Sequence, residues 1–312
     1  MIQISVVVCT YNRANMLARA LDSLIGQTLD KALYEIIVVD NASTDRTREV
    51  VRTFQGKYPE HTIVRIYEPQ QGLGYARNAG LKHAQGRYVA YLDDDARAST
   101  DWLKTALELF ETVKPTPICL GGHILPFYDS PNPKWFKDDY EIRTWGDKPR
   151  FLHRGESFSG SNMVWRKEIL EAFGGFDVRV GVKGGYLSVG EETVLFDKAW
   201  CSFDPPVFYY SPQLLVHHWV PPFKMTVSYQ LKRAFVAGQV WSQLHGPKTF
   251  HGRLRFLARN LFAIAKGSSL AAARRYAYRN WENWLVEEWG GVASNVGALM
   301  GAFGLVIPIR QG

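Results

Sequence analysis

The sequence predicts an α/β protein with a doubly wound, mostly parallel sheet and a helical C-terminal extension. Short runs of β-branched residues with little polar alternation, such as 4–9, are typical of strands covered on both faces. Segments with apolar residues at helical spacing separate these runs, as in βαβ units. After residue 224 the strand pattern stops, and the chain becomes basic and helical in pattern.

The first half of the chain alternates strands and helices. Strands are expected at 4–9, 34–39, 62–67 and 87–92, and helices at 17–25, 45–54 and 74–84. Gly26 is a natural stop for the first helix. We expect Asn12, in the turn before that helix, to cap its start.

Later elements are more widely spaced. An amphipathic helix is expected at 100–113 with Ser99 as its cap, and strands at 117–122 and 213–216. A short helix should end near Gly174 and Gly175. Residues 125–157 are rich in proline and aromatic residues, which is typical of a functional loop. The same aromatic residues could instead pin the loop to the core.

Composition limits the class of protein. Of 312 residues, 46% are hydrophobic and 21% charged, as in folded proteins. The three cysteines, Cys9, Cys119 and Cys201, are scattered, which argues against a disulfide framework and for a reducing, cytoplasmic setting. The N-terminus lacks a positively charged leader, so no signal peptide is expected.

The net charge of +7 is concentrated in the extension. Residues 1–224 hold 26 Lys/Arg and 27 Asp/Glu, whereas residues 225–312 hold 11 and 3. We therefore expect two domains, 1–224 and 225–312. Apolar and basic residues alternate around 253–266, as in a helix that lies on an anionic membrane surface, although a simply packed helix is the alternative. The glycine-rich stretch 289–309 is a poor spanning helix, so we expect peripheral attachment at the inner face of the cell membrane and no nucleic acid partner.

Three adjacent carboxylates, Asp93, Asp94 and Asp95, end the predicted strand at 87–92. In an extended segment Asp93 and Asp95 point to one side and Asp94 to the other. Two convergent carboxylates suit Mg²⁺ or Mn²⁺, the divalent metals that prefer oxygen ligands. An isolated run of this kind would more often be a solvated turn.

Polar clusters follow the other predicted parallel strands as well. In a doubly wound sheet, ligands bind at the carboxyl ends of the strands, where these clusters lie. The clusters are Thr10, Tyr11, Asn12 and Arg13 after the first strand, and Asp40 and Asn41 after the second. A glycine-rich helix start at 72–74 lies just before Arg77 and Asn78, which suits an anion. Because Arg77 stands where GxGxxG needs its third glycine, a dinucleotide fold is disfavoured.

Four segments together resemble glycosyltransferase family 2, with its GT-A nucleotide-sugar-binding fold. They are 6–13, 37–45, 76–80 and 91–95, and their order and spacing agree with the family. The resemblance covers roughly the first 220 residues. It implies an inverting transfer from a nucleoside-diphosphate sugar to an acceptor hydroxyl of a glycan or glycolipid, in polysaccharide or glycoconjugate synthesis.

The resemblance also implies roles for individual residues. Asp93 and Asp95 would form the DxD motif, with Asp95 as the direct metal ligand and Asp93 nearer the ribose or a bridging water. Donor-binding residues would be drawn from Thr10, Tyr11, Asn12, Arg13, Asp40, Asn41, Arg77, Asn78, Asp93 and Asp94. For Thr10 and Asn12, helix capping is compatible with this role.

A second pair of acids, Glu191 and Glu192, begins a predicted helix. The family usually has Glu-Asp here, with the second carboxylate as the catalytic base, so Glu192 is expected in that role and Glu191 beside it. Two acids could also simply favour a helix N-terminus. The glycine-rich stretch 180–190 just before them is expected to move around bound substrate.

Adjacent histidines, His217 and His218, follow the strand predicted at 213–216 and should point to opposite faces. Family members often carry a histidine here near the metal or diphosphate, and His217 matches that position better. Two rival functions stay open: a sugar-phosphate nucleotidyltransferase, and a non-catalytic nucleotide-sugar-binding module. The nucleotide base and the acceptor do not follow from the sequence.

Overall fold

The computed structural model describes residues 1–179, 190–204 and 207–309, and these form two compact units. The α/β unit consists of Met1–Phe127, Glu141–Arg179 and Glu191–Trp219, within those limits. The helical unit consists of Tyr128–Tyr140, Gly190 and 220–309. The glycine-rich stretch predicted to move lies, apart from Gly190, outside the described residues.

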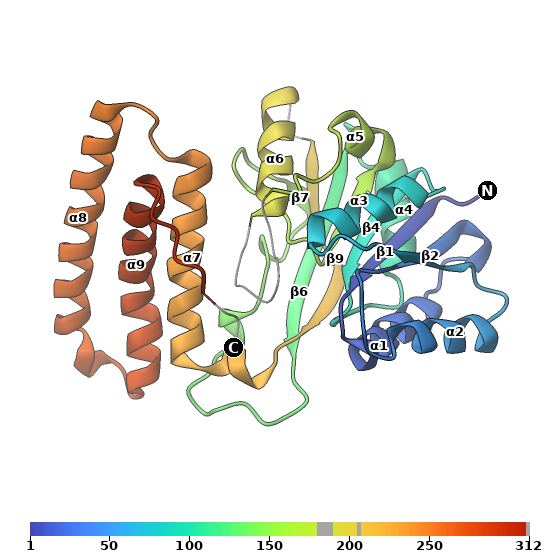
Figure 1. Ribbon diagram of the computed structural model, residues 1–312, viewed down its shortest axis with the longest axis horizontal. Helices are drawn as coiled ribbons and strands as arrows, with labels where there is room; N and C mark the ends of the chain where they lie inside the picture. Colours follow the sequence, from blue (N-terminus) through green and yellow to red (C-terminus); the bar gives the residue numbers. More distant parts are fainter. Residues whose placement is uncertain (180–189, 205–206, 310–312) are drawn as a thin grey trace. The chain divides into compact units, whose positions relative to one another are not determined.

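One sheet runs through the α/β unit, in the described strand order β3-β2-β1-β4-β8-β6-β9-β5, with β7 paired to β9 (Figure 1). Its strands are β1 (Ile4–Thr10), β2 (Tyr34–Asp40), β3 (Ile63–Tyr67), β4 (Tyr88–Asp93), β5 (Ala96–Ala98), β6 (Cys119–Phe127), β7 (Arg150–Phe151), β8 (Met163–Arg166) and β9 (Phe208–Trp219). Strands β1 to β4 pair in parallel, and β8 is antiparallel to both β4 and β6. The parallel part is the doubly wound sheet that the sequence predicts.

Helices cover both faces of this sheet, as a parallel sheet requires. Those of the α/β unit are α1 (Ala14–Ile25), α2 (Thr47–Lys57), α3 (Leu73–His83), α4 (Trp102–Thr112), α5 (Lys167–Ala172) and α6 (Glu191–Ser202), with the 3-10 turn η1 (Lys31–Leu33). One core lies between the strands and α1, α2 and α4, and the other contains side chains of α3, α5 and α6. The predicted fold class is confirmed.

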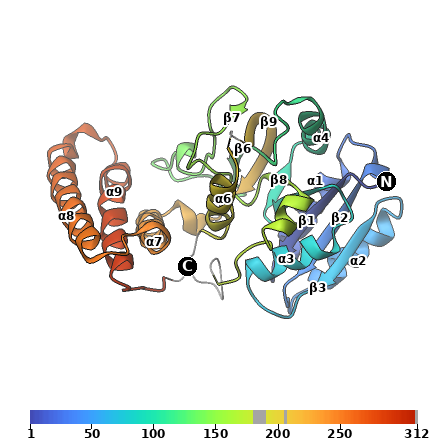
Figure 2. The same ribbon diagram turned by 90° about the horizontal axis from the view of Figure 1, so that it is seen from above.

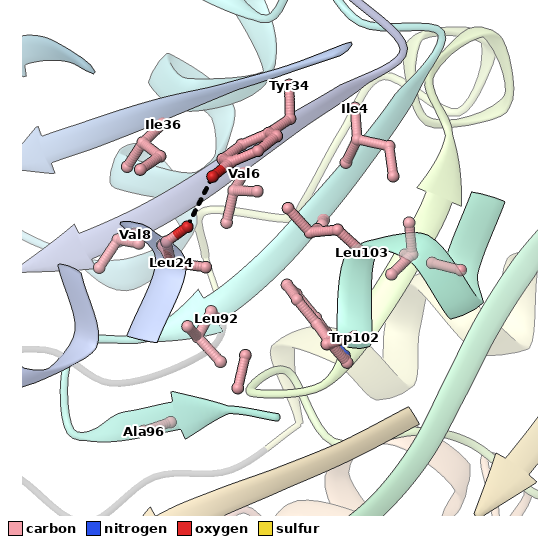
Figure 3. Close-up of a cluster of buried hydrophobic side chains, with 14 of the residues drawn as sticks. Ile4, Val6, Val8, Leu24, Tyr34, Ile36, Leu92, Ala96, Trp102 and Leu103 are labelled. Atoms are coloured by element: carbon pink, nitrogen blue, oxygen red, sulfur yellow. Dashed lines mark hydrogen bonds between the residues drawn. The ribbon is translucent and has the colours of Figure 1, made fainter. Parts of the chain in front are cut away.

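Figure 3 shows part of the first core. Trp102 and Leu103 at the start of α4 are fully buried beside Leu92 of β4. The hydroxyl of Tyr34 donates a hydrogen bond to the backbone oxygen of Leu24 at 2.8 Å, which satisfies the polar end of this buried ring.

The start of α1 differs from the prediction. Asn12 has a left-handed backbone (φ 54°), and its side-chain oxygen accepts a hydrogen bond from the backbone N–H of Thr44 at 2.7 Å. The first helical amide, that of Ala14, donates instead to Asp45 Oδ2 at 3.0 Å. The predicted cap from Asn12 is therefore wrong, because the loop after β2 supplies the capping oxygen. Helix α4 also lacks the cap expected from Ser99, since it begins after Asp101.

The helical unit contains three long helices, with α9 between α7 and α8 (Figures 1 and 2). Its elements are η2 (Asp138–Tyr140), η3 (Pro222–Met225), α7 (Val227–His245), α8 (Phe250–Ala273), η4 (Arg275–Ala277) and α9 (Trp281–Ala302). Within the described ranges, no helix combines the length and apolar character needed to cross a bilayer.

The segment Tyr128–Tyr140 belongs to this helical unit although it lies far from it in sequence. Asn283 of α9 donates hydrogen bonds to the backbone oxygen of Trp135 and to the hydroxyl of Tyr140, both at 2.6 Å. Lys137 forms an ion pair with Glu287 at 2.5 Å. Phe136 of this segment is buried with Val220 and Met225, and Tyr128, Trp135 and Tyr140 pack against this cluster, which is separate from the two cores of the sheet.

Candidate active site

The parallel strands bring three of the predicted loops to one edge of the sheet. Thr10 is the partner of Asp40 in the β1–β2 register, and Cys9 is the partner of Asp93 in the β1–β4 register. Strands β1, β2 and β4 therefore end side by side, as the alternation of strands and helices predicts.

Asp93, Asp95 and His218 form a cluster whose ligand atoms all lie within 4.8 Å of one another. His218 Nε2 is 3.2 Å from Asp95 Oδ1 and 3.7 Å from Asp93 Oδ2. Although burial opposes the shift, the hydrogen bond from His218 and the charge of Arg77 lower the pKa of Asp93. Two carboxylates and one imidazole are a donor set that Mn²⁺ or Mg²⁺ accepts, so the residues present fit a divalent metal.

The histidine of this cluster is His218 and not the expected His217. In the β5–β9 ladder, His218 pairs with Ala96, one residue from Asp95, whereas His217 pairs with Arg97. Adjacent residues of a strand point to opposite faces, so only one histidine can reach the carboxylates. The strand register, which the sequence does not reveal, decides which one.

Asp94 is buried and turned away from the cluster, toward the loop after β1. It accepts a hydrogen bond from Thr10 Oγ1 at 2.7 Å, and Arg13 donates to it at 3.2 Å. The same guanidinium donates to Asp95 Oδ2 at 2.9 Å. Burial and the nearby charge of Asp95 raise the pKa of Asp94 to about 7. Thr10 and Arg13 therefore fix the acidic turn.

The second candidate site, at Glu192, is tied to the first through Arg77. This arginine is buried, and its Nη1 lies 3.2 Å from Glu192 Oε1 while its Nη2 lies 3.7 Å from Asp93 Oδ1. Gly160 leaves the space for this pair, because a Cβ there would lie 2.0 Å from Arg77 Nη2 and 2.1 Å from Glu192 Oε1. Glu191 is the first residue of α6, and its side chain lies outside the described part of the structure.

Three predicted donor-binding residues are engaged in holding the loops. Asp40 is buried and paired with Arg65 at 2.5 Å. Asn41 accepts a hydrogen bond from the backbone N–H of Gly72 at 2.8 Å and donates to Gln70, so it fixes the start of α3. Asn78 exchanges hydrogen bonds with the backbone of Phe176 at 2.8 and 2.9 Å.

Two further predicted residues lie at the open side of this edge. The side chain of Tyr11 is 44% exposed, and Arg13 is similarly accessible. The sequence-based prediction preferred His217 to His218, and it included neither Arg65 nor Gly160 among the site residues. Arg65 could have been found, because it lies in a strand that is polar at that position and neighbours the strand of Asp40.

The sequence of this chain matches a known family. The family model for glycosyl transferase family 2 matches residues 5–173. The succinoglycan biosynthesis protein ExoM of Rhizobium meliloti (strain 1021) is 29% identical over 258 residues, which cover 80% of this chain and 77% of that protein. The glucosyl-dolichyl phosphate glucuronosyltransferase of Haloferax volcanii is 28% identical over 187 residues, which cover 58% of each protein.

Solved glycosyltransferases share the fold. The mannosyltransferase PcManGT from Pyrobaculum calidifontis, in complex with GDP-Man and Mn²⁺, superposes with a TM-score of 0.65 at 20% identity, covering 95% of this chain and 87% of that one. S. aureus TarS 1-349 in complex with UDP superposes with a TM-score of 0.57 at 17% identity, covering 97% of this chain and 91% of that one. Because the family model matches more than half of the chain, including most of its α/β unit, the chain belongs to glycosyl transferase family 2.

Proposed function

We propose that this glycosyltransferase moves a sugar, with inversion, from a nucleoside-diphosphate sugar to an acceptor hydroxyl. The observation that carries the proposal is the arrangement of two sites of chemistry at one sheet edge. The Asp93, Asp95 and His218 cluster suits a divalent metal, and Arg77 joins it to the carboxylate of Glu192. An inverting transfer needs a site for the leaving diphosphate and a base for the acceptor.

Asp95, Asp93 and His218 would hold the metal, Mn²⁺ or Mg²⁺. When bound, such an ion supplies Lewis-acid stabilisation of negative charge on phosphate oxygens. The protein's own contribution is to hold the carboxylate of Asp95 in place. Arg13 donates to Asp95 and Asp94 together, and Thr10 fixes Asp94, so neither carboxylate can rotate freely.

Glu192 is the proposed general base. It would take the proton of the acceptor hydroxyl as the oxygen forms a bond to the anomeric carbon and the carbon–diphosphate bond breaks, with its electron pair leaving on the diphosphate. Arg77, at 3.2 Å, orients the Glu192 carboxylate. Glu191 is the alternative base, one residue earlier in α6.

The loops after β1 and β2 would bind the nucleotide of the donor. Tyr11 and Asn12, which are exposed, and Thr10 and Asp40, which are buried, border this part of the edge. The structural neighbours support a nucleotide donor, because PcManGT holds GDP-Man with Mn²⁺ and TarS was solved with UDP and with UDP-GlcNAc. The relatives support a glycan acceptor, since ExoM takes part in succinoglycan biosynthesis.

A thermal-stability screen tests the donor class. The purified protein is mixed with UDP-, GDP- and dTDP-sugars, each with and without Mn²⁺. A ligand at 100 times its Kd adds about 2.7 kcal/mol to the free energy of unfolding, so a true donor should raise the Tm in a metal-dependent way. Stabilisation by none of these donors would contradict the proposal. Product analysis then separates sugar transfer from nucleotidyl transfer, because only the former releases a nucleoside diphosphate.

We also propose that helix α8 attaches the protein peripherally to an anionic membrane surface. No acidic residue lies between Asp204 and Glu282, and eight Lys/Arg lie in 247–281. Helix α8 buries Phe256 and Ala271, whereas Leu254, Leu261 and Phe262 are about half or more exposed. Exposed apolar side chains interspersed with arginines suit the boundary between lipid headgroups and acyl chains.

Vesicle co-sedimentation tests this attachment. Each cation near an anionic surface contributes about 1 kcal/mol, so replacing Arg255 and Arg259 by Gln should weaken binding to phosphatidylglycerol vesicles roughly 30-fold. The matched control replaces Arg48 and Arg52, two exposed arginines at the same spacing on α2. Binding to RNA in low salt without binding to these vesicles would refute the membrane proposal.

A further inference from the structure

One arginine beside the candidate active site is not explained by the chemistry above. Arg97 lies on β5, two residues after Asp95, and pairs with His217 in the antiparallel β5–β9 ladder. The flanking residues Ala96 and Ala98 face the first hydrophobic core. Because side chains alternate along a strand, Arg97 and His217 share the opposite face of this strand pair.

Arg97 has no counter-charge among the described residues. Its Nε is buried and without a hydrogen-bond partner, and its guanidinium stacks on the ring of Phe127, with Cζ 4.0 Å from the ring centroid. The other arginines of this sheet edge, Arg13, Arg65 and Arg77, are all paired with carboxylates. A buried donor without a hydrogen-bond partner lowers the stability of the folded protein. A stacked guanidinium of this kind therefore indicates a binding site, where a ligand would accept the hydrogen bond.

Two more N–H donors lie on the same face. Trp219 is two residues beyond His217 on β9, and its indole Nε1 is also buried and unpartnered. It is the register partner of Phe127 on β6, the residue on which Arg97 stacks. The Trp219 backbone N–H donates to the backbone oxygen of Asp95 at 2.9 Å, which fixes this face next to the carboxylate cluster. A neutral imidazole, such as that of His217, also carries one N–H.

We propose that Arg97, His217 and Trp219 form a subsite for an oxyanion, a phosphate or carboxylate group carried by a substrate. The guanidinium supplies the charge and a planar pair of donors, which match the oxygens of such groups. The identity of the substrate in this subsite rests on the proposed function, because the subsite adjoins the Asp93, Asp95 and His218 cluster that is proposed to hold the metal. The oxyanion belongs either to the diphosphate of the donor or to an anionic acceptor.

Arg97→Gln separates these sources. Affinities for UDP, GDP and the parent nucleosides are measured by calorimetry with Mn²⁺. Stabilisation by millimolar sulfate, compared with chloride at equal ionic strength, is measured by thermal unfolding with the nucleotide site saturated. Arg97→Lys keeps the charge without the planar donors. The matched control is Arg87→Gln, which removes an exposed arginine that also stacks on a tyrosine ring.

A donor role predicts that Arg97→Gln weakens nucleoside diphosphate binding about tenfold or more and leaves nucleoside binding unchanged, with partial rescue in Arg97→Lys. An acceptor role predicts unchanged diphosphate affinity and loss of the sulfate-specific stabilisation. If Arg97→Gln behaves as Arg87→Gln does in both measurements, the subsite is refuted. If the wild-type protein binds no nucleoside diphosphate, the donor proposal fails, and the sulfate measurement, made then without nucleotide, still decides whether the subsite exists.

Discussion

The guanidinium of Arg77 lies 3.2 Å from the carboxylate of Glu192, although 115 residues separate them in sequence. Arg77 is one of the largest fully buried side chains, and it also lies 3.7 Å from Asp93. A buried cation shared by two carboxylates lets both approach one reaction centre with less mutual repulsion. The orientation of the proposed base therefore depends on α3, which carries Arg77, as well as on its own helix.

Replacing Glu192 by Gln is expected to lower kcat on the order of 10²-fold or more, because the amide cannot accept the acceptor's proton. Affinity for the nucleoside diphosphate should stay within about twofold, since the fold and Arg77 remain. Steady-state kinetics and calorimetry check both. The control is Glu191→Gln. Should Glu191→Gln be the inactive variant and Glu192→Gln the active one, the assignment of the base would be reversed.

Gly160→Ala should impair transfer without unfolding the protein. The new Cβ would lie within about 2.1 Å of both Arg77 Nη2 and Glu192 Oε1, so the ion pair must move. We expect a fall in kcat of roughly tenfold or more, because small displacements of a catalytic group are costly. Gly56→Ala in α2, where nothing lies within 4 Å, is the control. Equal kinetics in the two variants would show that the space at Gly160 is unimportant.

His218→Ala should weaken Mn²⁺ binding, because His218 is the third member of the carboxylate cluster. The expected loss is on the order of tenfold or more, measured by the electron paramagnetic resonance signal of free Mn²⁺ without nucleotide. His217→Ala is the paired control, and its Mn²⁺ affinity should equal that of the wild type. A loss in His217→Ala alone would restore the original expectation from the sequence.

The packing of α7 against α9 depends on glycines. A Cβ at Gly297 would lie 2.0 Å from the backbone oxygen of Phe235, whereas one at Gly290, on the same helix, would meet nothing within 4 Å. Gly297→Ala should therefore lower the free energy of unfolding by about 1–3 kcal/mol through overpacking. Gly290→Ala should raise the free energy of unfolding by about 0.5–1 kcal/mol, because alanine favours a helix more than glycine does. Melting followed by circular dichroism at the helical band compares them. A lower Tm in Gly290→Ala would contradict this account.

His61 should make stability fall on acidification. Burial lowers its pKa, the positive charge of Lys31 adds to this, and Glu60 opposes it. Below pH 6.5 the unfolded chain then binds more protons than the folded one, so the free energy of unfolding falls as pH falls through the folded pKa of His61. When the pH is lowered from 7.5 to 5.5, the Tm of His61→Gln should fall less than the Tm of the wild type. Equal losses would exclude a contribution from this histidine.

Local patterns predicted the parallel part of the fold well. Strands β1, β2 and β4 are buried on both faces, so each reads as a nearly continuous apolar run, and the polar loops follow where each run stops. The carboxylate pair Asp93 and Asp95 could be found for the same reason. Their meeting place with the other loops follows from the parallel topology alone.

Long-range register explains the rest. Whether His217 or His218 reaches the carboxylates depends on the pairing of β5 with β9, more than 100 residues apart. The fit of Gly160 around Arg77 and Glu192 involves three distant segments. No periodicity within one segment records such a contact, so pattern reasoning could not have found either one.

The path of the chain through Tyr128–Tyr140 bears on how such a protein could be shortened or recombined. This segment leaves the sheet after β6 and packs Phe136 with Val220 and Met225 before the chain returns to β7. A chain cut after residue 224 would leave its aromatic side chains in water, without α9 to bind them. The helical unit is thus interleaved with the sheet-forming chain, and simple fusion at one end could neither add it nor remove it cleanly.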